Sequence, residues 1–98
     1  MTDRELLELA AKAAGVPYIK PSDDYDGSLG LAIGDNPMRT RTWNPLTDDG
    51  DALRLAVKLV IDIGDAQADY WDKDSTDPYA ATRRAIVRAA AVIGKAMK

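Results

Sequence analysis

The chain has 98 residues, of which 46% are hydrophobic and 30% charged, and its net charge is −3. This length and composition predict one globular domain over residues 1–98. The sequence contains no Cys and no His, which excludes thiolate nucleophiles, imidazole bases, disulfides and the usual zinc ligands. No signal peptide is recognised, and Arg88 and Lys95 interrupt the longest apolar run, so we expect a soluble protein of the bacterial cytoplasm without a membrane span.

Residues 2–15 predict a helix with a signal at each end. Thr2 and Glu5 have the spacing of a capping box, and Gly15 is suited to a left-handed helix end. Val16, Tyr18 and Ile19 then predict a short strand.

Residues 28–44 predict a β-hairpin. Apolar residues alternate at Leu29, Leu31 and Ile33, and residues 34–37, Gly-Asp-Asn-Pro, supply a turn. Arg39 and Arg41 share one face of the returning strand, which favours contact with solvent or with an acidic neighbour.

The stretch WNPLTDDGDALRLAVKL, residues 43–59, is either a functional site rich in carboxylates or only the start of a helix. We predict a helix entry, in which Trp43 ends the strand, Asn44-Pro45 turns the chain, and Thr47 or Asp48 caps the helix. The apolar period then predicts a buried stripe at Leu53, Ala56, Val57 and Val60.

Residues 61–70 change to a period of two and predict one or two strands with a bend at Gly64-Asp65. The last predicted helix begins at Pro78 behind an Asp77 cap and continues to Met97.

The predicted order is α-β-β-β-α-β-(β)-α. The expected fold is an α/β (α+β) single domain, an α/β/α sandwich in which three helices pack on a mostly antiparallel sheet of four to five strands.

No motif for catalysis or for a cofactor is present. The aspartate-rich loops do not have the ligand spacing of an EF-hand, because no bidentate Glu follows at position 12. The glycines at 27, 30 and 34 do not form a dinucleotide fingerprint, and no base is available to activate a serine. We therefore expect no enzyme, no catalytic residue, no metal site and no cofactor, with the acidic loops acting as helix caps.

Two binding hypotheses remain. The leading one is an unidentified protein partner, captured by an aromatic pair among carboxylates: Asp69, Tyr70, Trp71 and Asp72. The alternative is a polyanion such as nucleic acid, held by the basic side of the last helix at Arg84, Arg88 and Lys95. Residues 75–98 hold five Lys or Arg against one Asp or Glu, whereas residues 1–74 hold eight against fifteen. These cations could equally pair with the chain's own aspartates. Both a monomer and a homodimer are compatible with the sequence.

Two blocks of the sequence, residues 43–59 and DPYAATRRAIVRAAAVIG at 77–94, resemble the phage ABA-sandwich domain family of small phage and prophage proteins. The resemblance covers about half of the chain, including the opening helix. The matching positions in these two blocks are Trp43, Pro45, Asp48 or Asp49, Ala52, Leu59, Ala85, Arg88 and Ala89. It implies a sheet between helices and a phage or prophage origin, and it implies no particular activity.

Overall fold

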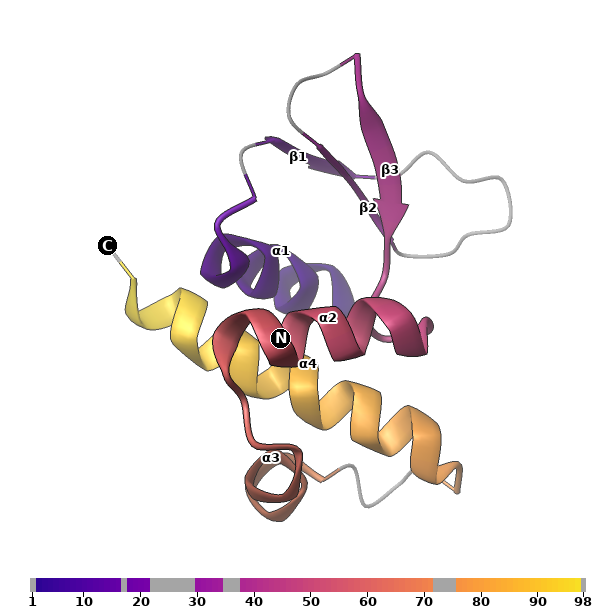
Figure 1. Ribbon diagram of the computed structural model, residues 1–98, viewed down its shortest axis with the longest axis vertical. Coiled ribbons are helices and arrows are strands. Elements are labelled where there is room, and N and C mark those ends of the chain that lie inside the picture. Colours follow the sequence, from indigo (N-terminus) through magenta and orange to yellow (C-terminus); the bar gives the residue numbers. More distant parts are fainter. Residues whose placement is uncertain (1, 17, 22–29, 35–37, 72–75, 98) are drawn as a thin grey trace.

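The computed structural model describes residues 2–16, 18–21, 30–34, 38–71 and 76–97. Within these ranges the chain forms four helices and three strands (Figure 1). In chain order they are α1 (Asp3–Ala14), β1 (Tyr18–Pro21), β2 (Leu31–Gly34), β3 (Thr40–Trp43), α2 (Asp49–Leu59), α3 (Ile63–Tyr70) and α4 (Pro78–Ala96). None of the helices described is both long and apolar enough to cross a membrane.

The predicted α/β/α sandwich with a sheet of four to five strands is wrong. The described residues form a mostly helical protein with one small sheet in the order β1-β2-β3. The error lies at residues 61–70, because residues 63–70 form the helix α3 instead of strands. Asp62 caps this helix by accepting a hydrogen bond from the Asp65 backbone N–H at 3.1 Å, and Ala66 is buried. The apparent alternation of Ile61 and Ile63 comes from the link between two helices.

The other three helices begin where local caps predict them. Thr2 accepts a hydrogen bond from the Glu5 N–H at 3.2 Å, Asp48 accepts from the Asp51 N–H at 2.8 Å, and Asp77 accepts from the Tyr79 N–H at 2.9 Å. Each cap satisfies a backbone donor that the helix itself leaves unpaired. Local sequence therefore indicated where α1, α2 and α4 start, and of the two candidates for α2 the cap is Asp48.

The sheet contains the predicted hairpin. Strands β2 and β3 pair antiparallel, with Leu31 opposite Trp43 and Gly34 opposite Thr40. Strand β1 pairs antiparallel with the other edge of β2. The predicted turn at residues 35–37 lies outside the described residues.

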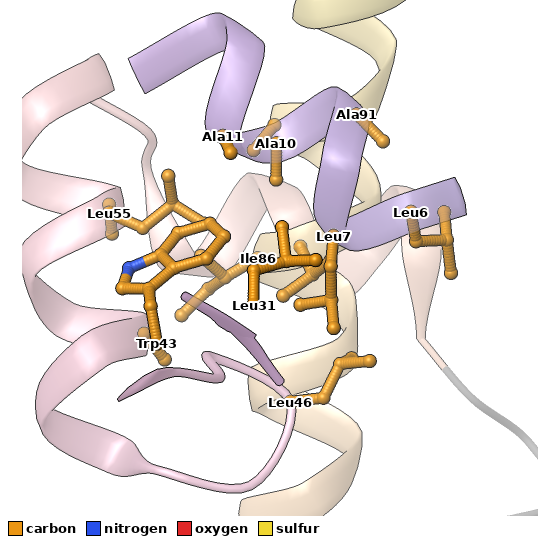
Figure 2. Packing of buried hydrophobic residues seen from close by; sticks show 14 of the residues in the cluster. Leu6, Leu7, Ala10, Ala11, Leu31, Trp43, Leu46, Leu55, Ile86 and Ala91 are labelled. Atoms are coloured by element: carbon orange, nitrogen blue, oxygen red, sulfur yellow. The ribbon is translucent and has the colours of Figure 1, made fainter. Parts of the chain in front are cut away.

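Helix α4 is the centre of the molecule and contacts α1, α2 and α3. Figure 1 shows the sheet at one end, beside α1 and α2, and α3 at the opposite end. Side chains from α1, α2, α4, β2 and β3 form one core. In Figure 2 the Trp43 indole lies beside Leu55, close to Leu31 and Ile86, and Trp43 is only 4% exposed. Trp43 is thus a core residue.

The predicted buried stripe of α2 is largely wrong. Leu53, Val57 and Val60 are exposed, whereas the buried positions of this helix are Asp51, Ala52, Leu55 and Ala56. The core therefore contacts a different face of α2 from the one that the apolar period indicated.

Candidate functional site

The C-terminal end of α3 carries the aromatic pair of the leading hypothesis. Tyr70 is the last residue of the helix and is half-buried, while Trp71 follows it, 39% exposed and outside the core. Asp69 is exposed beside them, and Asp72 lies outside the described residues. The structure thus brings Asp69, Tyr70 and Trp71 together at one helix end.

Two hydrogen bonds fix this end of α3 on α4. The Gln67 amide Nε2 donates to Thr82 Oγ1 at 2.9 Å, and Arg88 Nη1 donates to the backbone carbonyl oxygen of Tyr70 at 3.1 Å. A guanidinium at the last carbonyls of a helix satisfies an unpaired acceptor and is favoured by the helix dipole. Arg88 therefore holds the backbone from which Trp71 projects.

Helix α4 carries an exposed apolar side chain one turn beyond Arg88. Val92 is 52% exposed and follows Arg88 by four residues, which places it one turn further along the same face of α4. An exposed indole at a helix end offers contact area to another molecule without a loss of core packing.

The cations of the alternative hypothesis are largely engaged inside the protein. Arg84 donates two hydrogen bonds to the Asp3 carboxylate, at 2.8 and 3.2 Å, and Arg88 binds the Tyr70 carbonyl. The hydrogen bond from Arg84 lowers the pKa of Asp3 despite partial burial, and the positive charges of Arg84 and Arg88 lower it further. Lys95 is exposed in the last turn of α4. The structure does not gather these three side chains into a cationic site.

The stretch at residues 43–54 is a helix entry built around one buried carboxylate. Asp51 Oδ2 accepts a hydrogen bond from the Asn44 backbone N–H at 3.0 Å, and Oδ1 accepts from Arg54 at 2.7 Å and from Arg41 at 3.2 Å. Burial raises the pKa of Asp51, but the Asn44 N–H and the two guanidinium groups outweigh it, so the pKa lies below the ordinary value. Arg41 thus has the acidic neighbour that the sequence allowed.

A polar hollow of about 370 Å³ opens beside this carboxylate. Its lining residues are Arg41, Thr42, Asn44, Thr47, Asp48, Asp51 and Arg54. Because Asp51 already binds both arginines, the cationic and anionic groups of the hollow compensate one another. The arrangement stabilises the turn between β3 and α2 and presents no unpaired charge for a ligand.

Three other aspartates act as helix caps. Asp48, Asp62 and Asp77 each accept a hydrogen bond from a backbone N–H at a helix start. Over the described ranges, no three Asp or Glu side chains converge in a way that could hold a metal ion.

Sequence reasoning missed the burial of Asp51 and the exposed apolar face of α2. The first had a detectable signal, since Arg54 follows Asp51 by three residues on α2. Arg41 lies on the face of β3 that also carries the buried Trp43. The second had none, because which face of α2 is covered depends on the other helices.

These features define a small, mostly helical protein with a candidate protein-binding site at the end of α3. No protein-family model, curated protein or solved structure matches the chain. The resemblance to the phage ABA-sandwich domain family therefore remains a prediction from the sequence, and its implied sandwich does not agree with the fold.

Proposed function

We propose that this chain is a non-catalytic phage or prophage accessory protein that binds another protein, such as a host or defence factor, in the bacterial cytoplasm. The observation that carries the proposal is the exposure of Trp71 at a helix end that is fixed on α4. Exposed tryptophans held in place by their surroundings are typical anchors of protein interfaces. The phage context rests on the two sequence blocks.

The chemistry of the neighbouring residues supports a basic partner. Asp69 is exposed next to the aromatic pair, and carboxylates around an apolar contact accelerate association with a positively charged surface. A sequence without Cys and His lacks the side chains that most often act as nucleophiles and bases near neutral pH. These features favour binding over catalysis.

Nucleic acid is the less favoured partner. Binding to phosphates depends on Lys and Arg side chains that can exchange their counterions for the backbone of the nucleic acid. Arg84 and Arg88 would first have to release Asp3 and the Tyr70 carbonyl. Breaking these hydrogen bonds adds a free-energy cost to phosphate binding that a fully exposed cation does not have.

The test replaces Trp71 by Ala and measures both stability and capture of proteins from host lysate. A binding role predicts that the free energy of unfolding changes by no more than about 1 kcal/mol, as is usual for surface positions, while capture is lost. Tyr79→Ala is the matched control, because Tyr79 is an exposed aromatic at the start of α4. Trp43→Ala is the reference for a core tryptophan, with an expected loss of about 3–5 kcal/mol.

Nuclease treatment of the lysate separates the two kinds of partner. Capture that survives nuclease and disappears in Trp71→Ala supports the proposal. Capture that disappears with nuclease, or that Trp71→Ala leaves unchanged, contradicts it.

A further inference from the structure

Helix α2 and the residue that caps its C-terminal end carry a row of exposed apolar side chains, which we call the apolar ridge: Leu53, Val57 and Val60. Their exposed fractions are 55%, 69% and 89%. Leu53 and Val57 lie four residues apart on one face of the helix. Val60 follows as the left-handed C-cap of α2, and all three side chains line the same hollow. Single exposed apolar residues are ordinary, but a contiguous row of them marks an interaction surface.

A hollow lies along one side of the apolar ridge. Its volume is about 530 Å³, and it lies between the ridge and the start of α3, where Ile61, Asp62 and Ile63 complete its lining. A neighbouring hollow of about 300 Å³ shares Leu53 and Ile63 and extends to the exposed ring of Tyr79. A ridge next to hollows can interdigitate with an opposing surface of similar shape, as protein interfaces do.

The two edges of the apolar ridge carry opposite charge. On the side of the sheet, Arg54 and Lys58 are exposed and line hollows together with β3 residues. Arg54 also binds the buried Asp51, whereas Lys58 has no such buried partner among the described residues. On the side of α3, Asp62 and Asp65 are exposed and adjacent, since the Asp65 N–H donates to the Asp62 carboxylate.

We propose that the apolar ridge binds the ridge of a second copy of this chain, with the two-fold axis running along α2. A rotation about that axis places the cationic edge of one protomer against the anionic edge of its partner, so that Lys58 faces Asp62 and Asp65. An axis across the ridge would instead place Lys58 against Lys58. Self-complementary contacts of this kind are characteristic of two-fold dimers.

A second copy fits this surface better than an unrelated basic or acidic partner. A basic partner would complement Asp62 and Asp65 but would be repelled by Lys58 on the other edge. An acidic partner would complement Lys58 but would be repelled by the two aspartates. A second copy of this chain carries both a cationic and an anionic edge, and the two-fold rotation places each opposite its complement. The contact is separate from Trp71, which follows the opposite end of α3 from Ile63, so a dimer leaves the proposed partner site accessible.

The first experiment measures the molar mass by sedimentation equilibrium over a range of concentrations. We expect a reversible dimer of the native chain, and a monomer with unchanged helical circular dichroism for Val57→Glu. Val92→Glu is the matched control, since Val92 is also exposed and aliphatic but lies on α4, and it should remain a dimer. A native chain that is monomeric throughout, or a dimer that persists in Val57→Glu, overturns the proposal.

Charge reversal tests the direction of the axis. Lys58→Glu is expected to weaken dimerisation by about tenfold or more, because each substitution acts twice in a two-fold contact. Adding Asp65→Lys to the same chain should restore most of the affinity. If the double variant is no stronger than Lys58→Glu alone, the charges do not face each other and the axis is wrong.

Cysteine cross-linking gives an independent answer because the native chain has no Cys. An axis along the ridge places Leu53 opposite Leu53 of the partner, so Leu53→Cys should form a disulfide-linked dimer rapidly under mild oxidation. The Cα atoms must approach to about 4.4–6.8 Å for this bond. Val92→Cys is the control, and equal rates for the two variants would contradict the proposed contact.

Discussion

Asp51 joins a strand, a turn and a helix through one carboxylate. Its side chain is 7% exposed and accepts hydrogen bonds from Arg41 of β3, the Asn44 N–H of the turn and Arg54 of α2. A buried carboxylate is costly unless it is fully hydrogen-bonded. These three donors satisfy it, and they lower its pKa although burial acts in the opposite direction.

This pKa predicts part of the acid sensitivity of the protein. Because the pKa in the folded state is lower than in the unfolded state, the ionised carboxylate stabilises the fold above the unfolded value of about 4. That contribution is lost as the pH falls through the folded value. Asp51→Asn should lower the free energy of unfolding at pH 7 by about 1–3 kcal/mol and should lose less stability on acidification than the native chain.

Urea unfolding at a series of pH values between about 7 and 2 measures both effects. Asp3, whose pKa is also lowered, still titrates in the variant, so the pH dependence should be reduced and not abolished. Two curves with the same pH dependence, offset by a constant, would show that Asp51 does not contribute to it.

At the scale of elements, local signals were sufficient where caps determine a helix and insufficient where packing does. Thr2, Asp48 and Asp77 were identifiable as caps or candidate caps because capping involves residues only two or three positions apart. Helix α3 has eight residues, too few to be stable alone, and depends on α4. Its Asp62 cap is a local signal of the same kind as the other three, but the alternation of Ile61 and Ile63 favoured a strand instead.

The same distinction between local signals and long-range packing explains which features of the candidate site the sequence could not predict. The exposure of Trp71 and the pairing of Arg84 with Asp3 depend on how α1 and α3 lie on α4, which involves residues far apart in the sequence. For α2, two apolar faces compete, and the helical period does not indicate which one the core covers. Ala52, Leu55 and Ala56 are buried, and the larger residues of the ridge remain exposed.

Gly94 allows α4 to approach the backbone of α1 closely. A Cβ atom at this position would overlap the backbone carbonyl oxygen of Leu9, which cannot move without displacing α1. Gly94→Ala should therefore destabilise the protein by about 1–3 kcal/mol, the usual cost of overpacking, although alanine favours a helix by about 1 kcal/mol.

Gly64→Ala provides the matched control. Gly64 lies in α3, and an added Cβ would meet only the end of the Asp62 side chain. This substitution should stabilise the protein slightly, or leave it unchanged, in the same thermal unfolding experiment. If Gly94→Ala is as stable as Gly64→Ala, the two helices are not in contact at Gly94.

At the scale of the whole molecule, the helices do not share the core equally. The main core combines side chains of α1, α2, α4, β2 and β3. Helix α3 contributes the buried Ala66, which lies outside that core, and is fixed by Gln67–Thr82 and Arg88–Tyr70. Although α3 packs on α4, it has the fewest buried residues of the four described helices, so its opening exposes little buried surface.

We therefore predict that α3 opens locally while the rest of the protein stays folded. Backbone amides of α3 should exchange with deuterium at least about tenfold faster than the buried amides of α1 and α4, and with little dependence on denaturant, as local openings do. Arg88→Ala should accelerate exchange in α3 further, because it removes the hydrogen bond to the Tyr70 carbonyl, and should leave α1 unchanged. Since Trp71 follows α3, this variant should also weaken partner capture. Exchange of α3 only through global unfolding would show instead that all four helices form a single cooperative unit.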